Sequence, residues 1–329
     1  MDDIPVKVRV SIGTTALLGL RSLRLDAVPT TAYLMTYTEG GCVANCAFCS
    51  QARGSRSSRS QLSRVMWPEF PTDEVLEGLR REGGEVIERI CIQVINYPGF
   101  LDDVISLIEG IRVVTSLPIS VDTCPVPLEG FRRLREAGVE RVSIPLDAAT
   151  QELFDEVKGV GAEGPYRWGA HLEAIDAALY VFGEGNVMSN LIIGLGETER
   201  EAVELIQAMK DRGIAMVLYA FTPLPGTRFA DRPQPPLESY RRSQLARYII
   251  TGGDACIGDL EFDGEGRIVG FGRGVDASLL IGEGLPLRTT GCPGCNRPYY
   301  NERPSGPFYN YPSELTADEL KMEKERKLI

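Results

Sequence analysis

From residue 31 onward, short apolar and β-branched runs alternate along the chain with longer amphipathic segments. Short apolar runs bounded by turn residues are typical of buried strands, and apolar positions spaced three and four apart predict helices. Strands that alternate with helices predict right-handed βαβ crossovers and a parallel sheet, and six consecutive units favour a barrel or part of one. The six expected strands are residues 31–37, 89–95, 118–123, 141–147, 186–196 and 215–223, each followed by a helical segment.

The pattern changes beyond Gly252. Residues 256–272 contain two apolar runs joined at DGEG, which indicates a hairpin that closes or extends the sheet. The remaining chain is rich in Pro, Gly, Tyr and Asn and ends in a charged, helix-like stretch. We therefore expect an α/β protein in three parts: an N-terminal extension over residues 1–30, a partial TIM barrel with a (βα)6 core and a C-terminal β extension over residues 31–283, and a tail over residues 284–329 that caps the barrel.

Composition and charge exclude several classes of protein. The 329 residues are 43% hydrophobic, as in a globular protein with a full core. A formal net charge of −11 argues against a nucleic-acid partner, which calls for a basic face. The N-terminus has no basic segment and its apolar stretch, residues 16–20, is too short to cross a bilayer, so we expect a cytoplasmic protein with no membrane partner. Eight cysteines without a secretory signal predict metal ligands or buried thiols rather than disulfides.

The sequence has one local run of basic residues and one histidine. One basic run, with arginines at 53, 56, 59 and 64, is either a solvated loop or a site that receives an anionic group, because guanidinium suits carboxylate and phosphate. His171 is the one histidine, which removes most of the usual acid–base options. Its setting, WGAHLEAID, indicates an ordinary helix residue.

Three of the cysteines lie together in the segment GGCVANCAFCSQ. Cys42, Cys46 and Cys49 directly follow the first expected strand, and the C-terminal ends of barrel strands are where active sites lie. Cysteine thiolates hold iron–sulfur clusters, and a cubane cluster has four irons, so three ligands leave one iron open to a small molecule. The alternative is a zinc knuckle, which usually has a second ligand pair at finger-like spacing.

With Phe48 before the third cysteine, the motif C-x3-C-x-aromatic-C resembles that of the radical S-adenosylmethionine (SAM) superfamily. The resemblance implies a partial TIM barrel of radical SAM type. It also implies that Cys42, Cys46 and Cys49 hold a 4Fe-4S cluster, that SAM chelates the open iron through its amine and carboxylate, and that an external electron donor reduces the cluster. One electron then cleaves the sulfonium of SAM to a 5′-deoxyadenosyl radical.

Two later segments are similar to the cofactor-binding features of that superfamily. NLIIGLGE is close to the motif G-x-I-x-G-x-x-E that supports the adenine, with an asparagine in place of the first glycine. In SIPLDAAT an aspartate stands where the biotin-synthase branch has one that reaches the ribose, although Pro145 replaces an asparagine of that branch. The resemblance therefore implies five cofactor-binding residues: Asp147, Asn190, Ile192, Gly194 and Glu197.

Four other cysteines are the expected ligands of a second cluster. Biotin synthases carry cysteines in contexts similar to those of Cys91 and Cys124, where they hold a cluster that is consumed as the sulfur donor. A further cysteine of that branch aligns with Met188, which is a poor ligand. Cys292 and Cys295 form a C-x2-C pair in the tail that can chelate one metal or cluster. We expect Cys91, Cys124, Cys292 and Cys295 to bind an auxiliary cluster together, with the tail folded over the barrel mouth.

Other interpretations of these residues stay open. The strand cysteines can be ordinary buried thiols, and the tail pair can hold a small zinc site. Cys256, on the expected hairpin, is interpreted as a core thiol. The segment RTTGC is similar to a C-terminal segment of lipoyl synthases in which a serine oxygen binds the auxiliary cluster, which makes Thr289 or Thr290 an alternative ligand.

The whole pattern is similar to the two-component lipoyl synthases found chiefly in archaea. That resemblance implies sulfur insertion into an unactivated C–H bond of a protein-bound octanoyl-lysine. The implied partners are an octanoylated lipoyl-carrier protein or peptide and a second radical SAM subunit. The alternatives are a biotin-synthase-like sulfurtransferase, a radical SAM mutase or methylornithine-synthase-like enzyme, and a non-enzymatic iron–sulfur electron carrier.

Overall fold

The computed structural model of the chain describes residues 4–272, 274–326 and 328. Its main element is an eight-stranded sheet in the order β10-β9-β8-β7-β6-β2-β1-β5, in which the six strands from β10 to β2 run parallel. These six are the predicted strands, so the expected (βα)6 parallel core is confirmed. They are β2 (Thr31–Met35), β6 (Arg89–Gln93), β7 (Ile119–Asp122), β8 (Val139–Ser143), β9 (Val187–Ile193) and β10 (Ala215–Ala220).

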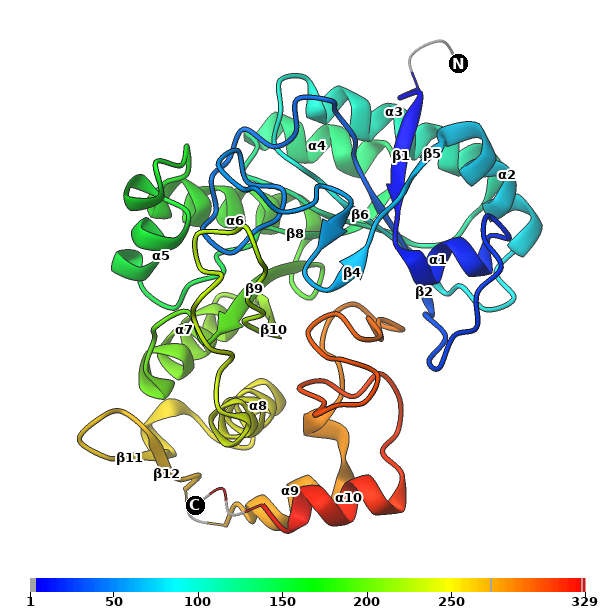
Figure 1. The fold of residues 1–329 in the computed structure, drawn as a ribbon. Helices are drawn as coiled ribbons and strands as arrows, with labels where there is room; N and C mark the ends of the chain where they lie inside the picture. Colours follow the sequence, from blue (N-terminus) through cyan, green and yellow to red (C-terminus); the bar gives the residue numbers. More distant parts are fainter. Residues whose placement is uncertain (1–3, 273, 327, 329) are drawn as a thin grey trace.

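Helices follow each parallel strand and cover the outer face of the curved sheet (Figure 1). The helix after β9 shows why these segments are helical: Thr198 and Glu201 form a capping box, and Val203 and Ile206 lie on the buried face. None of the helices in the described part of the chain is long and apolar enough to cross a membrane. The covering helices are α2 (Thr72–Glu82), α3 (Phe100–Val114), α4 (Leu128–Glu136), α5 (Gln151–Val157), α6 (Trp168–Phe182), α7 (Glu199–Asp211) and α8 (Leu237–Gly252).

Two antiparallel strands that the sequence did not suggest extend the sheet beyond β2. β1 (Lys7–Val10) pairs with β2 on one side and with β5 (Glu69–Pro71) on the other, and α1 (Ile12–Leu17) follows β1. The N-terminal extension is therefore part of the sheet from residue 7 onward. These strands have four and three residues, which is too short for apolar alternation to identify them.

The hairpin expected at residues 256–272 forms, but the expectation that it closes or extends the sheet is wrong. β11 (Glu261–Phe262) and β12 (Ile268–Gly270) make a separate two-stranded sheet (Figure 1). The main sheet therefore ends at β10 on one side and at β5 on the other, and no described strand bridges the gap between them.

The tail covers the free edge of β10 instead. It runs from α9 (Ala277–Glu283) to α10 (Ala317–Lys324), with a long loop between them that lies beside β10 (Figure 1). The N–H of Leu218 donates to Thr290 Oγ1 at 3.0 Å, and the N–H of Ala220 donates to Asn301 Oδ1 at 3.3 Å. An edge strand exposes alternate backbone groups, so these tail side chains satisfy donors that no strand pairs.

A buried arginine of α8 fixes the far end of the tail. The guanidinium of Arg241 donates to both carboxylate oxygens of Glu323, each at 2.9 Å, and to the carbonyls of Phe308 and Tyr309. Arg241 is 0% exposed and Glu323 is 3% exposed. Burial alone raises the pKa of Glu323, but the hydrogen bonds and charge of Arg241 outweigh it and hold that pKa below its usual value. The tail is therefore seated by a fully desolvated ion pair.

We predict that R241M lowers the free energy of unfolding by about 3 kcal/mol, because the buried Glu323 carboxylate loses its two-point partner and keeps only the contacts from Arg326 Nε (2.9 Å) and the Tyr311 hydroxyl (3.0 Å). Urea denaturation at pH 7 measures this change. The control is R132M, which removes an exposed pair with Glu129 (side chains 49% and 70% exposed) and is expected to cost less than about 1 kcal/mol. Equal losses in the two variants would contradict the proposed role of the buried pair.

Candidate functional site

The three-cysteine loop lies at the C-terminal end of β2, as expected. It is held there by backbone hydrogen bonds from Val43 to Asn96 (2.8 Å) and from Ala47 to Val157 (2.7 Å). The three thiols, Cys42, Cys46 and Cys49, line one cavity of about 200 Å³.

The donors around these thiols suit thiolate ligands. Backbone N–H groups of Asn96 and Gln51 donate to the sulfurs of Cys42 and Cys49, each at 3.4 Å. Burial raises the pKa of Cys49 to about 12, and it raises the pKa of Cys42 and Cys46 as well, so these thiols are neutral without a metal. A coordinated metal deprotonates a thiol outright.

The residues present fit a 4Fe-4S cluster held by Cys42, Cys46 and Cys49. The three thiols line one cavity, and two of the sulfurs accept backbone N–H groups, as the sulfurs of cluster ligands do. Among the described residues, no three His, Cys, Asp or Glu side chains form a group that could hold a single metal ion.

An ion pair that the sequence did not reveal lies in the same cavity. The ammonium group of Lys158 donates to Asp147 Oδ2 at 2.6 Å and to the carbonyl of Pro145 at 2.8 Å. Burial lowers the pKa of Lys158, but Asp147 and Cys46 outweigh burial and leave that pKa raised. A fixed cation thus lies beside the cluster cysteines. That Asp147 reaches a ribose stays a prediction, since Lys158 occupies one of its oxygens.

The β9 motif divides into two groups of residues. Asn190 and Ile192 line the cavity, as expected for cofactor contact. Gly194 and Glu197 do not line it; the Glu197 carboxylate accepts the N–H groups of Gly194, Leu195 and Gly196 at 2.6–3.1 Å. Glu197 therefore holds the turn after β9, and that Gly194 and Glu197 support the cofactor stays a prediction.

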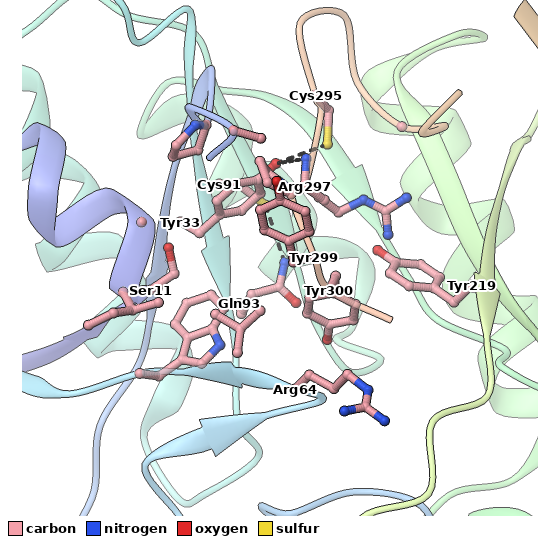
Figure 2. Close-up of a pocket in the computed structure, with 18 of the residues that line it drawn as sticks. Ser11, Tyr33, Arg64, Cys91, Gln93, Tyr219, Cys295, Arg297, Tyr299 and Tyr300 are labelled. Carbon is pink, nitrogen blue, oxygen red and sulfur yellow. Dashed lines mark hydrogen bonds between the residues drawn. The ribbon is translucent and has the colours of Figure 1, made fainter. Parts of the chain in front are cut away.

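A second cavity, of about 430 Å³, is lined by three of the four cysteines expected at the auxiliary site, two of which, Cys91 and Cys295, are labelled in Figure 2. Cys91 comes from β6, and Cys292 and Cys295 come from the tail. Tyr33 Oη lies 3.4 Å from Cys295 Sγ, and the side-chain amide of Gln93 donates to Cys91 Sγ at 3.2 Å. The expectation that the tail pair joins a strand cysteine is thus supported by the geometry.

The prediction that Cys124 is the fourth ligand of the auxiliary cluster is wrong, because Cys124 does not line the second cavity. Cys124 lies beyond the end of β7 and lines the first cavity, near Cys42. The β6–β7 register instead places Ser120 opposite Cys91, and Ser120, whose hydroxyl donates to the Ile90 carbonyl at 3.3 Å, lines the second cavity together with Cys91 and Cys292. A serine therefore stands where the sequence suggested a cysteine.

The C-x2-C loop of the tail lies at the N-terminal ends of the strands, whereas the sequence suggested a tail folded over the barrel mouth. The N–H of Thr30 donates to Asn296 Oδ1 at 3.1 Å, and Asn296 Nδ2 donates to the Val28 carbonyl at 2.8 Å. The two cysteine sets therefore approach the barrel interior from opposite ends.

Other parts of the tail and β9 complete these surroundings. Tyr300 and Asn301 of the tail line the first cavity. Met188, the position aligned with a cysteine of biotin synthases, has its sulfur 3.8 Å from Cys292 Sγ.

The structure does not support Thr289 or Thr290 as a ligand of the auxiliary cluster, or Cys256 as a core thiol. Thr289 donates to the carbonyl of Asn296 at 2.8 Å and Thr290 accepts a β10 N–H, and neither threonine lines the second cavity. Cys256 is exposed rather than a core thiol.

Arg297 is a further residue that sequence reasoning missed. Its guanidinium lies 4.0 Å from the centre of the Tyr219 ring, and its Nε is buried without a hydrogen-bond partner in the described part of the chain. Burial lowers the pKa of Arg297, but Tyr219 and Cys295 outweigh it and raise that pKa. A buried unsatisfied donor beside three thiols fits an anionic iron–sulfur cluster, because a bound cluster offers sulfur acceptors. Its place two residues after Cys295 was the available signal.

One wall separates the two cavities. The five residues that line both are Gln93, Asp122, Asn190, Tyr219 and Tyr300. Asn190 Nδ2 donates to Asp122 Oδ2 at 3.0 Å, and burial raises the pKa of Asp122 to about 7. The two cavities therefore adjoin along this wall, with one cysteine set on each side.

A sequence profile of the radical SAM superfamily matches residues 37–209, more than half of the chain. The chain belongs to the radical SAM superfamily. The matched segment contains the three-cysteine loop and β6 to β9, and membership implies a 4Fe-4S cluster and SAM.

Several of the similar curated proteins are biotin synthases. That of Hydrogenobaculum sp. (strain Y04AAS1) is 24% identical over 64% of this chain and 61% of its own length. That of Desulforudis audaxviator (strain MP104C) is 26% identical over 75% of this chain and 73% of its own length. That of Synechococcus elongatus is 25% identical over 80% of each. The match to the first of these spans less than two thirds of the relative.

Solved structures support the fold alone. Methylornithine synthase (PylB) superposes with a TM-score of 0.52 at 13% identity, covering 73% of this chain and 65% of that one. HydG, a maturase of FeFe-hydrogenase, gives a TM-score of 0.52 at 12% identity, covering 73% and 52%.

We predict that the anaerobically assembled protein holds about eight irons per chain, as two 4Fe-4S clusters require. C292A should reduce this to about four, whereas C124A should leave it unchanged, because Cys124 lies outside the second cavity. Iron and acid-labile sulfide analysis measures the content, and C256A, at an exposed cysteine, is the matched control. A C124A variant as poor in iron as C292A would contradict the ligand set of the second cavity.

A second prediction concerns the ionisation of His171, which is buried against Phe154 and Tyr166. Burial lowers its pKa to about 3, so the imidazole stays neutral at pH 5.5, where an ordinary histidine is about nine-tenths protonated. Between pH 6.5 and 3 the His171 imidazole is protonated in the unfolded chain but neutral in the native state. The free energy of unfolding therefore falls as the pH decreases from about 6.5 toward 3.

NMR of the metal-free protein tests this directly, because the chain has one histidine and therefore one set of imidazole signals. The same chain in urea is the control and should titrate near pH 6.5. A native signal that moves over that same range would show that His171 is solvated.

Proposed function

We propose that the enzyme inserts sulfur into an unactivated C–H bond, most specifically at one carbon of a protein-bound octanoyl-lysine. The observation that supports the proposal is that the two cavities, each lined by three of the expected ligand cysteines, adjoin along a shared wall. A radical generator on one side and a sulfur source on the other need this arrangement, because the carbon radical must meet sulfur before it meets water.

The roles of the chain's residues follow from their positions. Cys42, Cys46 and Cys49 hold the 4Fe-4S cluster, which with SAM supplies a 5′-deoxyadenosyl radical that abstracts hydrogen from an aliphatic carbon. Cys91, Cys292 and Cys295 would hold the auxiliary cluster, which would be consumed as the sulfur-donating co-substrate. Ser120 and Arg297 line the same cavity as these thiols.

The lining of the second cavity favours an aliphatic chain. Trp67, Val217 and Met188 form apolar walls, and the cavity opens to the surface past the exposed Met66. An open-ended, largely apolar channel suits an acyl chain that stays attached to a carrier protein outside. Under this proposal the partners are an octanoylated carrier, a second radical SAM subunit that completes the other insertion, and an external electron donor.

Biotin synthase activity is the second candidate, and the similarity to biotin synthases favours it. The position aligned with the remaining strand cysteine of that branch is Met188, and the tail supplies Cys292 and Cys295 instead. This difference in the expected cluster ligands favours a substrate other than that of biotin synthases.

Mass spectrometry of products tests the proposal. The assembled enzyme, SAM and a reductant are incubated with an octanoyl-lysyl peptide or with dethiobiotin, and we expect a thiolated octanoyl product together with 5′-deoxyadenosine. C292A should still form 5′-deoxyadenosine but no thiolated product, whereas C46A should form neither. Sulfur in dethiobiotin alone would favour the second candidate, and SAM cleavage without sulfur transfer to either substrate would overturn the proposal.

A further inference from the structure

We propose that the mouth of the second cavity is a docking surface for an acidic carrier protein that presents its acyl-lysine arm to the interior. This inference rests on the proposed function, because it names the surface chemistry of the partner that would deliver the substrate.

The mouth carries positive charge on an otherwise acidic protein. Arg24 and Arg303 are exposed, Arg64 is half-buried, and all three line the cavity (Figure 2 labels Arg64). Asp26 is the one exposed acidic residue among the described lining residues. The chain as a whole has a formal net charge of −11, so the sign of the local charge is reversed here.

These arginines have no carboxylate partner of their own. Salt bridges elsewhere on the surface use Arg133 with Asp102 and Arg232 with Glu156, but in the described part of the chain none involves Arg24, Arg64 or Arg303. The Nε of Arg64 is buried without a hydrogen-bond partner. Guanidinium groups left free in this way suit carboxylates of a second protein.

Three segments far apart in sequence meet to form this mouth: the loop that contains Arg24, the hairpin β3–β4 (Gln61–Leu62 and Val65–Met66), and the tail. The hairpin and tail are joined by Ser63 Oγ, which donates to the Tyr300 carbonyl at 2.7 Å. Arg24 and Arg303 are exposed, whereas Trp67 of the same lining is buried in a cluster against which Cys91 and Cys295 pack. The cavity thus combines exposed cations with a buried apolar and thiol lining. This combination matches an acidic surface that carries an aliphatic arm.

The same arginines do not favour nucleic acid. Three guanidinium groups on a chain of net charge −11 form too small a basic face for a phosphate backbone. Charge complementarity to a protein of opposite sign chiefly raises the association rate and specificity, and it weakens with salt.

The test compares two substrates on the same variants. One is an octanoylated acidic carrier domain, and the other is a neutral octanoyl-lysyl tripeptide that has no protein surface. For R24E/R303E we expect the ratio of kcat/KM for the carrier to kcat/KM for the tripeptide to fall about tenfold, and for R24K/R303K to recover most of it. R132E, at an exposed arginine outside both cavities, is the matched control and should leave the ratio unchanged. In the parent enzyme the ratio should fall with added salt.

The docking proposal would be overturned if R24E/R303E left the ratio of the two kcat/KM values unchanged. That result would mean either that neither kcat/KM fell or that both fell by the same factor. Failure of the proposed function looks different, because neither substrate then gains sulfur. In that case fluorescence anisotropy of the labelled carrier decides: weaker binding to R24E/R303E than to R132E supports docking, and equal binding overturns it. Salt-resistant binding of a single-stranded RNA probe that R24E/R303E abolishes would also overturn it.

Discussion

The seating of the tail along the free edge of β10 is the constraint on which the second half of the site depends. The sheet is an open barrel, and an uncovered β10 would leave backbone donors without partners on the inner side of a cavity. Thr290 and Asn301 satisfy two of these donors, and the buried pair of Arg241 and Glu323 fixes the end of the same segment. A buried pair is costly to break because each charge has already lost its water. The tail is therefore a structural part of the barrel, and its cysteines are held in one place.

Two chemical environments result within one interior. The first cavity combines cluster thiols with the Lys158–Asp147 pair, so it is polar and charged, as suits a zwitterionic nucleoside cofactor. The second combines thiols with Arg297 and a largely apolar wall. The two cavities share five lining residues, so they adjoin within the barrel interior. Such an arrangement limits the lifetime of a radical by position rather than by acid–base catalysis, which agrees with a chain that has one histidine.

Two buried cations, Lys158 and Arg297, each lie beside one of the cysteine sets. Although the protein is acidic overall, its buried cations lie where anions or their ligands gather: Lys158 beside Cys46, and Arg297 beside Cys295. Each cation would be expensive to bury alone, and each is stabilised by a neighbouring negative or polarisable group. Burying a charge in this way keeps it from water and makes its effect on the site strong.

The sequence by itself determined the parallel core and the first cluster site. The six strand–helix units follow from local apolar patterns, and Cys42, Cys46 and Cys49 must lie together because so few residues separate them. The sequence could not determine β1 and β5, which are too short to have a pattern, or the hairpin's failure to join the sheet. Nor could it place Lys158 or Arg297, whose contacts come from distant segments.

Only the tertiary structure decided the second site. The β6–β7 register turns Ser120 rather than Cys124 toward Cys91, and the tail enters from the N-terminal ends of the strands. The physical reason is that thiols close in sequence meet whatever the fold, whereas thiols far apart meet only where strand register and the covering of an open sheet edge bring them.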